Sequence, residues 1–207
     1  MGWFGAISAM APGEPCKALR LLAQPRRASL LAALLLAACA PEPRLTYDLS
    51  PAAGIAAKGG RGQLAVLMPE AVQPANSDRI VVRTGAQSVA YLTGAQWADN
   101  LPSLIQSRLI ETFQNAHLLR SVGKPGMLAD YSLQTTLRRF ELDAAQGEAV
   151  VEMTAQLIGP SGRIAAGRLF AAREPVASAA PGAVAAGLDA ALRTVMREIV
   201  AWAAPKI

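Results

Sequence analysis

The sequence is poor in the side chains on which most catalytic sites depend. Its 207 residues contain one histidine, and aromatic side chains make up 5% of the chain. A Ser-His-Asp triad would have to form around His117, and a histidine-rich metal site is excluded. His117 follows a predicted helix, where a residue at the helix boundary is the ordinary interpretation. No spacing of carboxylates resembles a calcium loop. We therefore expect a protein that is not an enzyme.

Charged residues are also scarce, at 17% of the chain against 52% hydrophobic residues, which excludes a disordered protein. The net charge of +5 suggests an affinity for polyanions, but residues 1–38 carry +3 of it. From Cys39 onward, 16 basic side chains face 14 acidic ones. This small excess does not support binding to nucleic acid.

Long hydrophobic runs are missing as well. The apolar run at residues 30–38 is too short to cross a bilayer, which takes about 20 residues. It follows a basic stretch at residues 17–27 and precedes Cys39, the order found in a secretory signal peptide. The sequence therefore predicts export and no membrane-spanning segment in the mature chain.

The four residues that end this leader resemble a bacterial lipobox. Leu36, Ala37 and Ala38 fit the peptidase recognition positions, and Cys39 would carry a diacylglyceryl group and an N-acyl chain. The alternative is an ordinary signal peptide followed by an unmodified Cys39. Exported thiols normally pair, however, and the other cysteine, Cys16, lies in the removed part. Lipidation would leave no thiol for catalysis or metal binding.

These features divide the chain into three parts. Residues 1–38 form the signal peptide, residues 39–45 the lipidated cysteine with a proline-rich tether, and residues 46–205 one periplasmic domain. Two or more acyl chains anchor a protein firmly. Ala40 follows the cysteine in place of the Asp that retains lipoproteins in the inner membrane. We therefore expect the domain at the periplasmic face of the outer membrane.

Hydrophobic periodicity predicts an α+β fold, with two amphipathic helices packed on one face of an antiparallel sheet. Asn100 and Pro102 begin the first helix, and Pro181 begins the second, which runs to Trp202. The expected strands lie at residues 45–49, 63–68, 79–83 and 88–92 and in a meander over residues 130–173.

The polar residues of most interest are Arg138 and Arg139. The positions expected to share one face of the strand change parity between Leu137 and Phe140, which predicts a β-bulge at the two arginines. They are candidates for contact with a partner or a lipid headgroup, although basic residues at strand edges often only prevent aggregation.

Two other motifs have ordinary interpretations. The stretch Lys58-Gly59-Gly60-Arg61-Gly62 lacks the Gly-Lys-Ser/Thr ending of a phosphate-binding loop, so a flexible loop is expected. Asp99 and Glu111 straddle the start of a predicted helix, where Asp commonly serves the cap or the helix dipole rather than acid–base chemistry.

Over about residues 39–205 the sequence resembles the ABC-type transport auxiliary lipoprotein family, whose members accompany MCE-type (mammalian cell entry) lipid transport systems. The resemblance rests, after the lipobox, on Tyr47-Asp48-Leu49, Ala90-Tyr91-Leu92, Trp97-Ala98-Asp99-Asn100-Leu101-Pro102, Ala129-Asp130-Tyr131-Ser132-Leu133, Arg139-Phe140-Glu141-Leu142, Phe170, Arg173-Glu174-Pro175 and Trp202. We expect Trp97 to be buried beneath the first helix and Phe140 to mark the strand that this helix covers.

The resemblance implies an accessory, non-ATPase subunit that contacts the MCE protein and bridges the periplasm, with the ATPase and permease as separate chains. It implies no cofactor beyond the lipid on Cys39, and no lipid-binding site is transferred from the family. An outer-membrane structural or assembly lipoprotein that works without a transporter is the alternative, and an anchored hydrolase using His117 is a third hypothesis. Exposed strand edges would permit homo-oligomers without fixing the number of subunits.

Overall fold

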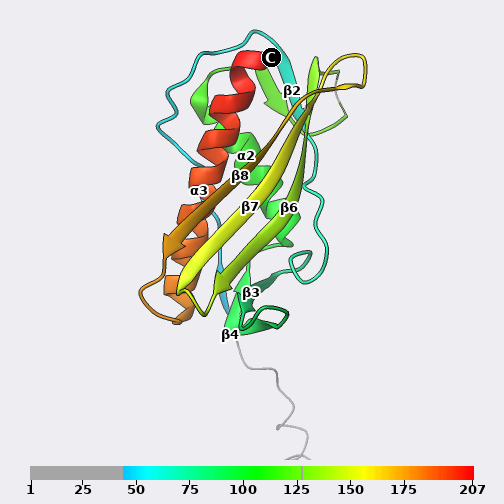
Figure 1. Cartoon of the computed structure of the whole chain (residues 1–207). Helices are drawn as coiled ribbons and strands as arrows, with labels where there is room; N and C mark the ends of the chain where they lie inside the picture. The colour runs from blue at the N-terminus through cyan, green and yellow to red at the C-terminus, as the bar shows by residue number, and fades with distance from the viewer. Residues whose placement is uncertain (1–43, 127) are drawn as a thin grey trace, which may run out of the picture. The chain divides into compact units, whose positions relative to one another are not determined.

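The computed structural model describes residues 44–126 and 128–207 (Figure 1). The predicted signal peptide, the lipobox and Cys39 lie outside these residues. The strands are β1 (Leu45–Tyr47), β2 (Gln63–Val66), β3 (Arg79–Arg83), β4 (Val89–Trp97), β5 (Ser121–Gly123), β6 (Tyr131–Asp143), β7 (Glu148–Ile158) and β8 (Ile164–Pro175). The helices are α2 (Leu101–Ala116), α3 (Pro181–Ala203) and the short 3₁₀ helix η1 (Ala204–Lys206). Neither α2 nor α3 is long and apolar enough to cross a membrane.

Strand β6 organises the sheet, which is mixed and not antiparallel as the sequence predicted. Along one edge β6 pairs with β7, which pairs with β8, and both pairings are antiparallel. Along its other edge β2 and β3 lie end to end, both parallel to β6. Strands β1 and β5 also pair in parallel, with β4 and β2 respectively. A parallel neighbour requires a crossover connection, and three of the four residues of β2 are buried, as is typical of a parallel strand.

The predicted bulge is present in β6. The register with β7 shifts between Leu137 and Arg139. Because of this shift, Leu137 and Phe140 both face the core, although they stand three positions apart.

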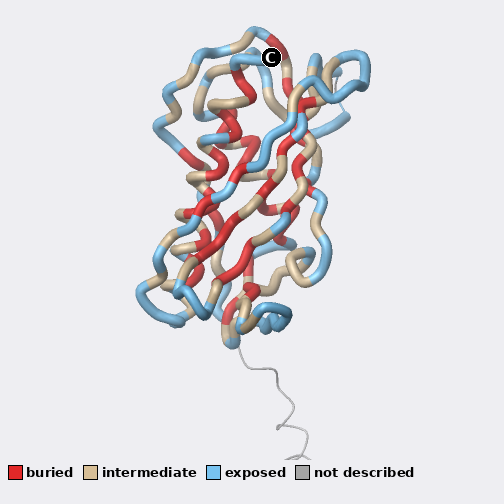
Figure 2. The backbone as a smooth tube through the Cα atoms, viewed as in Figure 1, coloured by how far each residue is buried: buried red, intermediate tan, exposed pale blue. Residues whose placement is uncertain are grey.

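The core lies between the sheet and the two helices, and both helices bury residues in it (Figures 1 and 2). Helix α3 packs on β7 and β8, whereas α2 packs on β2, β5 and α3. The indole of Trp97 is 1% exposed and meets the ring of Phe140 edge-on, with centroids 5.7 Å apart. Near the C-terminal end of α3, Trp202 packs edge-on against Phe170, with centroids 5.6 Å apart.

Candidate functional site

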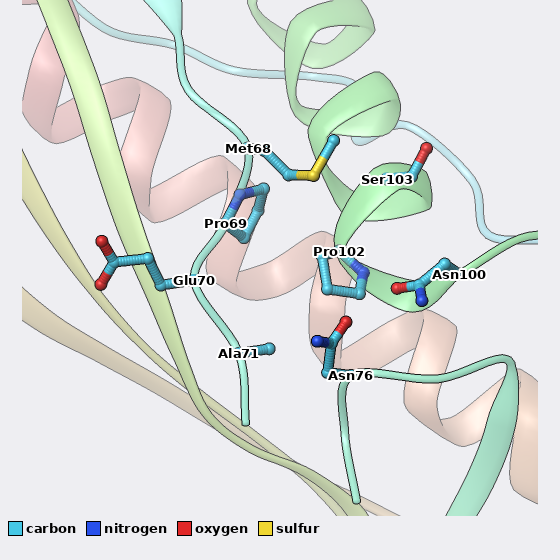
Figure 3. Close-up of a pocket in the computed structure, with 8 residues that line it drawn as sticks. All are labelled: Met68, Pro69, Glu70, Ala71, Asn76, Asn100, Pro102 and Ser103. Atoms are coloured by element: carbon cyan, nitrogen blue, oxygen red, sulfur yellow. The ribbon is translucent and has the colours of Figure 1, made fainter. Parts of the chain in front are cut away.

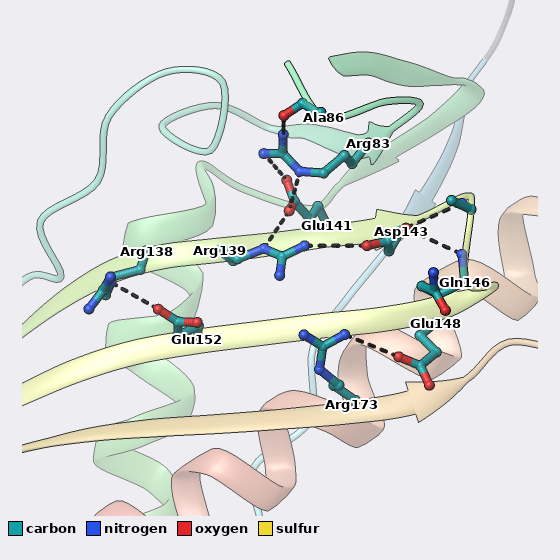
Figure 4. A network of polar contacts seen from close by, with 11 residues as sticks. Arg83, Ala86, Arg138, Arg139, Glu141, Asp143, Gln146, Glu148, Glu152 and Arg173 are labelled. Carbon is teal, nitrogen blue, oxygen red and sulfur yellow. Dashed lines mark hydrogen bonds and ion pairs between the residues drawn. The ribbon is translucent and has the colours of Figure 1, made fainter. Parts of the chain in front are cut away.

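The buried Glu141 of β6 is the centre of an ion-pair network that joins β3 to β6 (Figure 4). It is 4% exposed. Arg83 of β3 donates to both of its carboxylate oxygens, at 2.7 and 3.0 Å, and the Nε of Arg139 donates to Oε1 at 2.7 Å. Burial raises the pKa of Glu141, but the hydrogen bonds from the two guanidinium groups outweigh it, so the net pKa is lowered. The carboxylate therefore stays charged and holds β3 against β6.

The two arginines that the sequence analysis identified, Arg138 and Arg139, lie in different environments in the structure. Arg139 lies 26% exposed against Glu141 and approaches Asp143 at 3.6 Å. Arg138 is 53% exposed and pairs with Glu152 of β7 at 2.9 Å. Arg139 is thus part of the internal network, while Arg138 is a surface residue in a weak ion pair. Contact of either arginine with a partner or a lipid headgroup remains a prediction.

The β2–β3 connection explains why the bulge borders a small cavity. Beyond β2 the backbone still follows β6. The backbone N–H of Glu70 donates to the carbonyl of Thr135 at 2.8 Å, and the backbone carbonyl of Glu70 accepts from the N–H of Leu137 at 2.8 Å. The connection then turns away from β6, and a cavity of about 190 Å³ lies beside the bulge. Its lining is Val72, Gln73, Pro74, Ala75, Val81, Arg83, Leu137, Arg138, Arg139, Phe140 and Glu141.

A larger groove of about 420 Å³ lies between the same connection and the start of α2 (Figure 3). Met68, which is 54% exposed, lines it together with Pro69 and Pro102. Asn76, Asn100 and Ser103 supply amide and hydroxyl groups, and Glu70 is the one ionisable residue of the lining. Figure 3 shows the Glu70 carboxylate turned away from the two asparagines. The groove offers surface for a mixed polar and apolar group, without a pair of groups for acid–base chemistry.

The remaining candidate residues have structural roles in the fold. His117 is exposed and ends α2 in the left-handed conformation, with φ at 51°. Asp99 accepts hydrogen bonds from the Asn100 N–H at 2.6 Å and the Ser103 hydroxyl at 2.9 Å. Asn100 stands at the cap position without a side-chain cap bond. Glu111 instead pairs with Arg108 one turn away. Within residues 44–126 and 128–207, no three His, Cys, Asp or Glu residues form a group that could hold a metal.

The glycine-rich stretch is a packing loop. The N–H of Gly60 donates to the carbonyl of Leu118 at 2.9 Å. A Cβ at Gly60 would lie 2.5 Å from the carbonyl oxygen of Ala204, and one at Gly62 would lie 2.8 Å from Ile207. Glycine is therefore required for close backbone approach to the chain's last residues, and no phosphate-binding role is needed to explain it.

The fold and these contacts can be compared with known proteins. The family model described as "ABC-type transport auxiliary lipoprotein component" matches residues 47–200, from β1 to the last turn of α3. The chain belongs to this family. The resemblance seen in the sequence is thereby confirmed, and the family's description is of a lipoprotein that is an auxiliary component of ABC-type transport.

Several individual proteins are similar to this chain. The uncharacterized protein bll6063 of Bradyrhizobium diazoefficiens is 32% identical over 169 residues, which are 79% of this chain and 46% of that protein. The chain thus spans about half the length of this relative. The crystal structure of protein XCC0632 from Xanthomonas campestris, of the family DUF330, aligns with a TM-score of 0.72 at 29% identity, covering 77% of this chain and 93% of that one. A second solved structure, of an uncharacterized protein, shares the fold at a TM-score of 0.63 and 15% identity, with coverage of 77% and 97%.

Proposed function

We propose that this protein is an accessory, non-ATPase subunit of an ABC/MCE-type lipid transport system. In this proposal a lipid on Cys39 anchors it to the periplasmic face of the outer membrane, and its domain contacts the MCE protein. The observation that carries the proposal is the family match over residues 47–200. The leader supports the anchor, because Leu36, Ala37 and Ala38 precede Cys39 in lipobox order.

The position of the anchor limits how far the domain can stand from the membrane. Five Cα-to-Cα steps, from Cys39 to Arg44, separate the lipidated position from the first described residue. At about 3.3 Å per residue they reach roughly 17 Å at most. The domain would therefore remain close to one membrane, and a partner would have to complete any bridge across the periplasm.

Crosslinking followed by affinity capture tests the proposal on the full chain in the envelope of the native cell. We expect an MCE-domain protein among the crosslinked partners, with the bait in the outer-membrane fraction. The matched control is Cys39→Ser, which cannot be lipidated. This variant should no longer be found in the membrane fraction, and most of the crosslinked partner should be lost.

Failure to find an MCE-domain protein after crosslinking would contradict the proposal. If the bait then remained in the outer membrane, the result would favour a structural or assembly lipoprotein that acts without a transporter. The presence or absence of neighbouring genes for an ABC ATPase, a permease and an MCE protein separates the same two functions.

A further inference from the structure

One end of the domain carries a cluster of basic residues from distant parts of the sequence, which we call the basic end. Four chain segments meet there: the glycine loop, the segment after α2, the segment before β6 and the C-terminal residues. Arg120 donates its N–H to the carbonyl of Gly62 at 3.1 Å, and Gly60 packs against Ala204. The exposed cations of the basic end are Lys58, Arg61, Arg120, Lys124 and Lys206.

These cations differ from most others in having no carboxylate partner. None of the five forms an ion pair with any residue of the described chain. The one acidic side chain among these segments, Asp130, accepts a hydrogen bond from the Gln63 N–H at 2.8 Å. Elsewhere between residues 44 and 207 the chain has eleven cations and twelve carboxylates. The excess positive charge of the domain is thus concentrated at one end, where it creates a local positive potential.

The surface between the cations is hollowed and partly apolar. A depression of about 460 Å³ is lined by Gly60, Arg61 and residues 117–120, and a neighbouring one of about 320 Å³ shares His117 and Arg120 with it. Leu128, close by in the segment before β6, is 97% exposed. Arg61 and Arg120 line these hollows, and arginine beside an exposed leucine matches the composition of a protein-binding surface, in which arginine is enriched.

The basic end also lies far from the point where the described chain begins. The end of the short strand β1 is near the beginning of α3, because a Cβ at Gly182 would lie 3.6 Å from the Tyr47 hydroxyl. The basic end packs instead on Ala204, just past the other end of α3 (Figure 1). Twenty-two residues of helix span about 33 Å. This exceeds the roughly 17 Å reach of residues 39–43, so the domain cannot stand on its basic end at the membrane that would hold Cys39, and an upright domain presents that end to the periplasm.

We propose that the basic end is a docking surface for an acidic segment of a protein partner, with Arg61 and Arg120 as its central cations. The cluster of unpaired cations is a property of the domain alone. The orientation of the basic end toward the periplasm rests on the proposed anchor at Cys39, and the identity of the partner as the MCE protein rests on the function proposed above. Charge complementarity would steer the encounter and set the register of the bound segment.

Photocrosslinking from the basic end tests this inference in cells that produce the full lipidated chain. A photoreactive amino acid replaces Leu128, and a control places it at Leu169 of β8, which is 47% exposed. Mass spectrometry then identifies the crosslinked molecule and the crosslinked segment. We expect a protein adduct from position 128 that maps to a segment rich in Asp and Glu, and no such adduct from position 169.

Charge reversal shows whether the cations are responsible. Arg61→Glu with Arg120→Glu should reduce the adduct at least about fivefold. Arg168→Glu with Arg197→Glu is the matched control, since neither arginine is in an ion pair of the described chain, and it should leave the adduct unchanged. Folding of both variants is checked by their unfolding curves.

Each other outcome has a defined meaning. A lipid adduct, a crosslinked segment without acidic residues, no adduct at all, or an adduct unaffected by charge reversal overturns the inference. An acidic partner without an MCE domain keeps the docking surface and contradicts the proposed function. An MCE partner captured through other surfaces alone keeps the proposed function and contradicts the docking surface.

Discussion

The two ends of the domain use their basic residues in opposite ways. Near the β3–β6 junction, Arg83 and Arg139 both donate to the buried Glu141, and their cations are satisfied inside the fold. At the basic end, Arg61 and Arg120 lie exposed without ion pairs among the described residues, and the backbone itself makes the close contacts. Ion pairs therefore stabilise one end, whereas glycine packing stabilises the other and leaves its cations available for binding.

The largest effect is expected at the ion-paired end. Glu141→Ala leaves two facing guanidinium groups without their shared carboxylate, so we expect the free energy of unfolding to fall by about 2–3 kcal/mol. The matched control is Glu152→Ala, whose partner Arg138 is half exposed, and which should cost less than about 1 kcal/mol. Urea unfolding of the purified proteins measures both. An equal fall in the free energy of unfolding in the two variants would show that the buried ion pairs of Glu141 stabilise the fold no more than an exposed pair does.

The corresponding change at the basic end concerns the backbone. Gly60→Ala places a methyl group 2.5 Å from the Ala204 carbonyl oxygen, which should destabilise the domain by about 2 kcal/mol through overpacking. Gly85→Ala is its control, because a Cβ there meets nothing closer than 3.7 Å in the β3–β4 turn. Thermal unfolding compares the two. A neutral Gly60→Ala would mean that the glycine loop does not hold the end together.

Much of this fold was predictable because its elements show local patterns of apolar and polar residues. The parity change before Phe140 correctly located the bulge, and β3 has the predicted bounds, Arg79–Arg83. The parallel pairing of β2 was missed, although its run of buried residues is the signal that could have indicated it. Strand β5 was also missed, because Ser121–Gly123 is too short to show any periodicity.

The candidate sites were less predictable, because they join residues far apart in the sequence. Arg139 and Glu141 lie two positions apart on β6, so their proximity was visible, but Arg83 reaches them only through the pairing of β3. The cations of the basic end come from several segments. From the sequence alone, each of these segments is predicted only to be an exposed loop or chain end, with no indication that they meet. Arg138 and Arg139 both form ion pairs within the domain, with Glu152 and Glu141 respectively, and neither ion pair was predicted from the sequence pattern.

A smaller effect follows from the lowered pKa of Glu141. Burial alone would raise this pKa, but the hydrogen bonds from the guanidinium groups of Arg83 and Arg139 hold it below its unfolded value. A lowered carboxyl pKa contributes stability above the unfolded pKa, and that contribution is lost as the pH falls through the folded pKa. We therefore expect the stability gap between the wild type and Glu141→Gln to narrow on acidification below the ordinary carboxyl range. Unfolding curves over a pH series measure it, and a gap independent of pH would contradict the assignment.

The smallest expected effect gives the most direct test of the account. If the cations of the basic end are reserved for binding, Arg61→Glu with Arg120→Glu should change the free energy of unfolding by less than about 0.5 kcal/mol. Urea unfolding of this variant beside the wild type, at low salt, is the decisive measurement. Coincident curves are the predicted result. A loss of more than about 1 kcal/mol would show that these cations have structural partners, and would contradict the division between a paired end and a binding end.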